Sequence, residues 1–293
     1  IFIFFNILWI VFGVVELFIP EISDVITKLR TDSSRGVTSL ANEATDFGIY
    51  LFFSSLIIFN LDFLLKKKQI NKLLIVNFLS VLFLAKSSMV ILFYIICISF
   101  FLIFKFYYTI LEKKIKKMTL INTLFLILFF LVIFFLFKDS LLNTRLNFLT
   151  NRLVNEQSIM KIIITDWSIN SRVESVYFSI VGSFKNFLLP GGLDSFVEMR
   201  QEILSSMQKE IFYNRVESNK IMSWIGTLSY ELGIFGLIII SLFFLASYRS
   251  YRGSILYSFT LFIVLFSAIP VAFPLVSMLF TLMVYKKNYN FYN

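Results

Sequence analysis

The chain has 293 residues, of which 58% are hydrophobic and 15% charged, and its mean hydropathy is +0.83. So few charged residues exclude an ordinary soluble domain of this length, because its surface would lack polar side chains. The net charge of +9 does not indicate a nucleic-acid partner, since many basic residues form short clusters beside apolar runs, a pattern typical of membrane topology.

Apolar runs approaching the ~20 residues that cross a bilayer as a helix follow one another along the chain. They predict an all-α, polytopic membrane bundle with helices at 1–19, 47–65, 70–85, 89–107, 118–137, 222–247, 254–268 and 272–285. The chain begins inside an apolar run, and we expect earlier helices to precede it. Pro270 and Pro274 predict a break between the last two helices; one long kinked helix is the alternative.

Basic clusters between these helices fall on one side of the predicted bundle. They are Lys66 to Lys68 with Lys72, Lys113 and Lys114 with Lys116 and Lys117, Arg249 with Arg252, and Lys286 with Lys287. The positive-inside rule makes that side cytoplasmic. The sequence thus predicts N-terminal membrane helices at 1–137, a large external loop at 138–221 and C-terminal membrane helices at 222–293.

The external loop contains two amphipathic segments. Ser171 and Glu174 have the spacing of a capping box, which predicts a helix that starts at Arg172 and ends at Pro190-Gly191-Gly192. Its apolar stripe comprises Val173, Val176, Tyr177, Ile180, Val181, Phe184, Phe187 and Leu188. In the second segment Phe196, Ile203, Leu204, Met207 and Ile211 face one way, and Glu198, Arg200, Glu202, Lys209 and Glu210 mostly face elsewhere. Such helices lie on the outer membrane surface or cover the bundle.

Charged residues on the predicted external side are the candidates for chemistry. Arg172, in the first turn of its helix, would add a guanidinium to backbone N–H groups that already favour an anion. Pairing with Glu174 or with a lipid headgroup is its alternative role. Arg35 and Glu43 precede the second helix, where Glu43 and Asp46 would stabilise the first turn.

Two further carboxylates lie near the predicted outer interface. Glu231 precedes a nearly unbroken apolar run, where a carboxylate is costly unless it faces a cavity or a cation; packing as a paired acid is its alternative. Glu217, close to Arg215, is a candidate general base, with a solvated charged loop as the alternative.

Motifs for other chemistries are missing. The chain has no His and one cysteine, Cys97, which excludes an internal disulfide and a Cys-based metal site. There is no Walker loop, GxGxxG, HExxH or nucleophile elbow. We therefore expect no metal and no cofactor.

Five short segments, taken in order, resemble one family. They are "RGVTSLANEATDFG", "LAKSSMVIL", the long loop from Arg172 to "LLPGGLDSF", "LSYELGIFGLI" and "AFPLVSMLFTLMVYKK". Their order and predicted sidedness are similar to those of the polysaccharide polymerases of the O-antigen and capsule pathways, the Wzy-like group of the O-antigen ligase superfamily. Ala44 stands where proline is common in the family.

The resemblance implies a metal-independent membrane glycosyltransferase at the outer face of the bacterial plasma membrane. It would join oligosaccharide repeat units carried on undecaprenyl pyrophosphate, which serve as both donor and acceptor. Pyrophosphate binding would fall to Arg172, Arg35 and Arg215, and the base to Glu217, with Glu231 and Asp194 as competitors. Candidate partners are the bilayer, a chain-length regulator and a flippase, with no nucleic acid.

Three alternative functions follow from the same pattern. The first is a non-catalytic membrane scaffold, in which the charged residues of the long loop would serve only for solvation. An O-antigen ligase typically carries a histidine before the Glu-Leu-Gly helix, whereas this chain reads "ESNKIMSW" there, which favours a polymerase. A lipid-linked oligosaccharide flippase or other transporter should place charges along a path near the bilayer midplane, and the predicted middle helices carry almost none.

Overall fold

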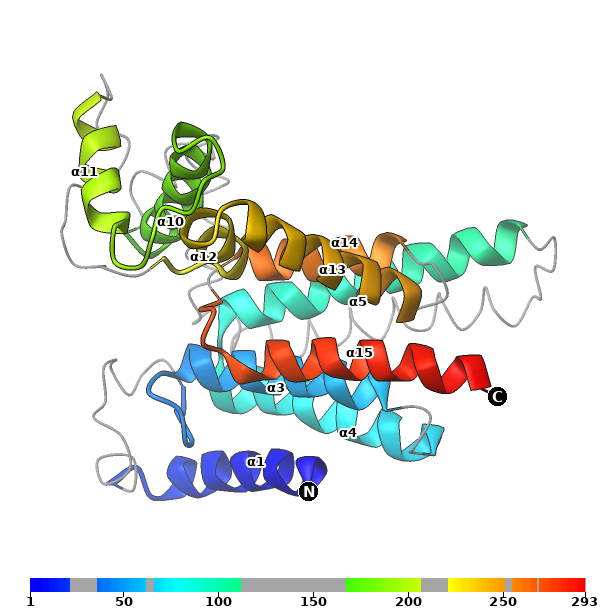
Figure 1. The fold of residues 1–293 in the computed structure, drawn as a ribbon. Coiled ribbons are helices and arrows are strands. Elements are labelled where there is room, and N and C mark those ends of the chain that lie inside the picture. The colour runs from blue at the N-terminus through cyan, green and yellow to red at the C-terminus, as the bar shows by residue number, and fades with distance from the viewer. Residues whose placement is uncertain are drawn as a thin grey trace. The chain divides into compact units, whose positions relative to one another are not determined.

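The computed structural model describes residues 1–21, 36–61, 66–111, 167–206, 221–250, 255–267 and 269–292. Every regular element in these ranges is a helix, which confirms the all-α class (Figure 1). The chain forms two compact units, one of Ile1–Phe148 with Leu275–Asn293 and one of Leu149–Pro274.

The first unit holds most of the predicted N-terminal helices. Its elements are α1 (Phe2–Phe18), α3 (Ala44–Asn60), α4 (Lys67–Ser80), the π-helical turn η2 (Val81–Ala85), α5 (Ser88–Leu111) and α15 (Pro274–Tyr292). The predicted helices at 1–19, 47–65, 70–85, 89–107 and 272–285 are therefore confirmed, with ends that shift by a few residues. The predicted helix at 118–137 lies outside the described residues.

Helix α3 is the centre of this unit. Phe47, Leu51, Phe53, Ile57 and Ile58 are all fully or almost fully buried, so the helix is covered on several sides. A helix that is apolar all round is stable only when neighbouring helices or lipid surround it.

A chain of buried polar side chains joins four helices of the unit. Asn6 of α1 donates from Nδ2 to Asn77 Oδ1 of α4 (2.8 Å), and Asn77 Nδ2 donates to Ser55 Oγ of α3 (3.1 Å). Ser55 Oγ in turn lies 2.7 Å from the hydroxyl of Tyr94 in α5. In apolar surroundings such bonds fix how helices are arranged, because a displaced polar group finds no water.

The second unit contains α10 (Trp167–Lys185), α11 (Phe196–Ser206), α12 (Trp224–Glu231), α13 (Ile234–Ser250) and α14 (Ile255–Phe266). Helices α10 and α11 confirm that the predicted external loop contains helices. Together with α12 and the residues before it, they enclose a hydrophobic core of Phe178, Phe196, Met199, Ile203, Ile221 and Tyr230.

The predicted single helix at 222–247 is wrong, because the chain breaks between α12 and α13. Gly233 has φ +55°, a left-handed conformation that interrupts the helical hydrogen-bond pattern. The N–H of Ile234 instead donates to the carbonyl of Leu188, 2.8 Å away, in the turn after α10. This long-range partner explains why an apolar run alone did not predict the break.

The predicted break at the two prolines is confirmed. Helix α14 ends at Phe266 and α15 begins at Pro274, whose missing N–H costs nothing at the first helical position. The alternative of one long kinked helix is therefore wrong.

Within the described ranges, one helix is long and apolar enough to cross a membrane, Lys67–Ala85 with 19 residues. Shorter apolar helices of 10–17 residues are Phe2–Phe18, Ala44–Asn60, Ser88–Phe100, Ile234–Ser250, Tyr257–Phe266 and Pro274–Tyr285. The polytopic membrane bundle therefore remains a prediction.

Candidate functional site

The predicted site residues are divided between the two units. Glu43 belongs to the first unit, whereas Arg172, Asp194 and Glu231 belong to the second. Arg35, Arg215 and Glu217 lie outside the described residues.

Arg172 does not open its helix. Because α10 already includes Trp167, Arg172 lies in the second turn or later, and the predicted capping box of Ser171 and Glu174 is wrong. The anion site expected from free N–H groups at a helix start therefore does not form around Arg172. Its half-buried guanidinium remains a candidate for a phosphate or carboxylate.

Glu174 is bound by Arg200, a residue that the sequence predicted to face away from the apolar side of the second amphipathic segment. Arg200 of α11 donates from Nε to Glu174 Oε1, and both side chains are buried. Burial raises the pKa of Glu174, while the hydrogen bond and the charge of Arg200 act to lower it. The pair ties α10 to α11.

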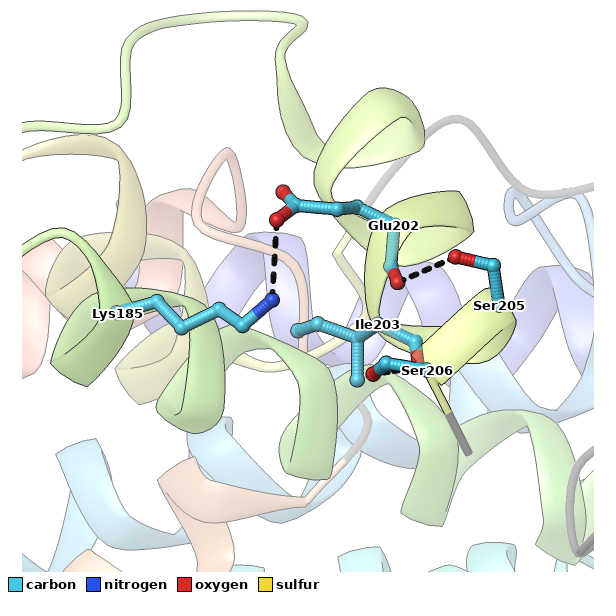
Figure 2. Close-up of polar contacts among 5 residues, drawn as sticks. All are labelled: Lys185, Glu202, Ile203, Ser205 and Ser206. Carbon is cyan, nitrogen blue, oxygen red and sulfur yellow. Dashed lines mark hydrogen bonds and ion pairs between the residues drawn. The ribbon is translucent and has the colours of Figure 1, made fainter. Parts of the chain in front are cut away.

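A second ion pair joins the same two helices at the surface. Lys185 Nζ lies 3.2 Å from Glu202 Oε1, and both side chains are exposed (Figure 2). Ser205 and Ser206 donate to the carbonyl oxygens of Glu202 and Ile203 at the end of α11. Solvent screening means that an exposed pair such as this one contributes little to stability.

Helix α10 buries the face opposite to its apolar stripe. Ser175, Ser179 and Ser183 are buried, whereas Val173 and Phe184 are exposed. Small side chains let α10 and α12 approach closely: a Cβ on Gly226 of α12 would overlap the Ser179 hydroxyl. The two predicted roles of this amphipathic helix, a place on the membrane surface or a cover over the bundle, both stay predictions.

The segment after α10 lies across the break between α12 and α13. Besides the bond between Leu188 and Ile234, the N–H of Gly191 donates to the Tyr230 carbonyl (2.8 Å). The hydroxyls of Ser195 and Tyr230 are 3.0 Å apart, which closes the segment onto the end of α12. These bonds position Asp194 beside the last residue of α12.

Asp194 and Glu231 are thereby brought within electrostatic reach of each other. Glu231 ends α12, and Asp194 lies in the segment before α11 with φ +61°. Partial burial raises the pKa of Glu231, and the negative charge of Asp194 raises it further. A carboxylate with a raised pKa is a stronger base, so this pair is suited to accepting a proton. The sequence named both residues as candidates but could not place them together.

Glu43 is the residue just before α3 and does not lie in the first turn of that helix, contrary to the prediction. Its backbone is extended (φ −140°, ψ 150°), its side chain makes no cap hydrogen bond, and it is half-buried. Asp46 does lie in the first turn, as predicted.

A buried carboxylate that the sequence analysis missed holds the segment after Arg35. Glu16 of α1 accepts the Thr38 N–H at 2.9 Å and 3.0 Å, the Thr38 hydroxyl and the Ser39 N–H. The apolar context of α1 gave no signal for this role except the presence of a carboxylate near its end. Through these three donors, the carboxylate of Glu16 holds residues 38 and 39 against α1.

The same segment packs against the turn at Lys86. The N–H of Val37 donates to the Leu84 carbonyl (2.9 Å), and a Cβ on Gly36, which has φ +116°, would lie 2.5 Å from the Ala85 carbonyl oxygen. Two of the segments that carried the resemblance, "RGVTS" and "LAKSS", are therefore in contact in the first unit.

Comparison of the chain with protein-family models, curated proteins and solved structures finds no match. The case for a function rests on the residues of this chain. Among the described residues no group of three or more His, Cys, Asp or Glu side chains is placed to hold a metal ion.

Proposed function

We propose that this chain is a polysaccharide polymerase of the bacterial plasma membrane. It joins oligosaccharide repeat units linked to undecaprenyl pyrophosphate, on the external face, and needs neither metal nor nucleotide. In this proposal the apolar helices of both units cross the membrane, and α13 starts at the outer interface with Glu231 just before it.

The pairing of Asp194 and Glu231 at the start of α13 is the observation that supports this function most. A glycosyl transfer to a hydroxyl needs a base, and the raised pKa of Glu231 gives a carboxylate that is more basic than usual. Its place just before an apolar helix suits a substrate with a lipid tail and a polar head, because a carboxylate and an apolar surface follow each other along the chain.

The reaction itself requires one bond to form and one to break. The acceptor hydroxyl oxygen attacks the anomeric carbon of the donor sugar, and its proton passes to the carboxylate. The bond between the anomeric carbon and the phosphate oxygen breaks, and undecaprenyl pyrophosphate leaves with the electron pair. Glu231 is the described candidate for the base, and Glu217 is the competitor that the sequence favours.

Arginines supply the counter-charge that the leaving group needs. Arg172, Arg35 and Arg215 are the candidates, since a guanidinium binds a phosphate through two parallel hydrogen bonds.

The test is a set of complementation experiments in cells that lack the protein. Lipid-linked glycans are separated on a gel after expression of the wild type, Glu231→Gln, Glu217→Gln or Arg172→Ala, with protein amounts measured by immunoblot. The matched control is Glu202→Gln, a carboxylate exposed at the surface of α11.

We expect single repeat units without the protein, a ladder with the wild type and Glu202→Gln, and single units with Arg172→Ala and with the variant that lacks the base. Repeat units that never reach the outer face without the protein would instead indicate a transporter. Finished polymer that is not transferred to its final acceptor would indicate a ligase.

A further inference from the structure

The last turn of α10 and the segment after it expose large apolar side chains, which we call the turn patch: Phe184, Phe187, Leu189 and Leu193. Phe184, Phe187 and Leu193 expose 68%, 88% and 78% of their surface. Phe187 and Leu188 have φ of 52° and 60°, conformations that are costly for bulky side chains. The left-handed backbone is held by the end of the helix itself, because the Leu188 N–H donates to the Ser183 carbonyl (2.8 Å). The exposure of these apolar side chains is what marks the turn as an interaction surface.

The turn patch is continuous with the outer surface of α13. The bond between the Leu188 carbonyl and the Ile234 N–H joins the turn to the first residue of α13, where Ile234 and Phe235 are themselves exposed. A side chain at Gly233 would overlap the Leu188 carbonyl oxygen, so the two backbones are in direct contact. The exposed apolar surface then runs along α13 through Ile238, Ile239, Leu242 and Leu245.

The length of α13 is close to the thickness of a bilayer core, and its charged residue lies at the end away from the turn patch. Helix α13 has 17 residues, or about 26 Å at 1.5 Å per residue, which is close to the hydrocarbon thickness of a bilayer. Its far end carries exposed Tyr248 and Arg249, residue types that favour the membrane interface. Residues 186–193 contain no charged side chain.

We propose that the turn patch inserts into the outer leaflet, at the boundary between headgroups and acyl chains. The inference rests on the proposed function, which states that α13 crosses the membrane and that its first residue lies at the outer interface. Asp194 follows Leu193 directly, and Glu231 lies two residues before Gly233. Insertion of the turn patch therefore sets the carboxylate pair at the depth of the lipid phosphates, where the pyrophosphate of a lipid-linked sugar lies.

Spin labels on the full chain in liposomes of phosphatidylethanolamine and phosphatidylglycerol test the insertion. The background is Cys97→Ala, and single labels are placed at Phe187→Cys and Leu193→Cys in the turn patch. Gln201→Cys, exposed on α11, is the matched control, and Ile238→Cys reports on α13. Each label is measured for collision with oxygen, which enters lipid, and with a water-soluble nickel chelate.

We expect labels at 187, 193 and 238 to collide mainly with oxygen, and the label at 201 mainly with nickel. Water-like labels at 187 and 193 with a lipid-like label at 238 would overturn the insertion and leave the membrane location intact. A water-like label at 238 as well would overturn both. Labels at 187 and 193 shielded from both reagents would overturn lipid insertion in favour of a protein partner. None of these readouts depends on polymerase activity, so an inactive but lipid-inserted protein would separate the inference from the proposed reaction.

Discussion

At the scale of single residues, the proximity of Asp194 to Glu231 has a consequence for pH dependence. In the proposed reaction Glu231 is the base and works in its ionised form, so activity should be present above its pKa and be lost as the pH falls through it. The charge of Asp194 raises that pKa. In Asp194→Asn the charge is gone, the pKa of Glu231 falls, and the acid limb of the rate profile moves to lower pH.

Initial polymerisation rates measured against pH for the wild type and Asp194→Asn check this prediction. Glu198→Gln, an exposed carboxylate on α11, is the control and should leave the acid limb in place. An acid limb that does not move in Asp194→Asn would assign it to another group, with Glu217 as the next candidate.

Removing the basic partner should cost very different amounts of stability in the two ion pairs between α10 and α11. Arg200→Ala leaves the buried carboxylate of Glu174 without its partner, a change that typically costs about 3–5 kcal/mol. Lys185→Ala breaks an exposed pair, which is typically worth less than about 1 kcal/mol. Thermal unfolding of the purified protein in detergent should therefore show a large fall in Tm for Arg200→Ala and almost none for Lys185→Ala. Equal falls would contradict the burial of the first pair.

At the scale of elements, the break between α12 and α13 depends on Gly233. Gly233→Ala adds a Cβ both in a left-handed conformation and against the Leu188 carbonyl oxygen. Gly192→Ala is the matched control: its φ is +88°, but nothing lies within 4 Å of the added Cβ. The left-handed conformation alone costs roughly 1–2 kcal/mol.

We expect Gly233→Ala to lower Tm clearly more than Gly192→Ala and to reduce polymerisation, because the segment that carries Asp194 would shift. If the two variants behaved alike, the contact between the turn and the start of α13 would not matter for stability.

The sequence predicted elements well wherever a local pattern decides them. Apolar runs located α1, α3, α4, α5, α14 and α15, and Pro270 and Pro274 located the last break. The prediction from sequence failed where residues distant in the sequence determine the local structure. Ser171 and Glu174 lie inside α10 and not at its start, and Glu174 pairs with Arg200, which lies 26 residues further along.

The candidate site shows the same division. Residue types and sidedness were enough to name Asp194 and Glu231, but their proximity depends on hydrogen bonds from Leu188 and Gly191 to another helix. Glu16 escaped notice because a carboxylate near the end of an apolar helix gives no indication that it accepts N–H groups 22 and 23 residues further along.

At the scale of the whole molecule, the proposed function fixes the direction in which the chain crosses the membrane. Residues of α11 should lie outside and the basic segment at Lys67 inside. In the Cys97→Ala background, a membrane-impermeant maleimide applied to intact cells should label Gln201→Cys and not Lys67→Cys. Both positions are exposed, and both should react once the membrane is permeabilised. Labelling of Lys67→Cys in intact cells would reverse the orientation and move Asp194 and Glu231 to the cytoplasmic side.

The central claim is tested most directly by the reaction of the purified protein. Lipid-linked repeat units extracted from cells that lack it are mixed with the reconstituted chain, without nucleotide or added metal, and the glycans are separated by length. We predict a ladder from the wild type and unchanged single units from Arg172→Ala, with protein of equal amount and fold. Single units that stay unchanged with folded, membrane-inserted wild-type protein would contradict the polymerase assignment.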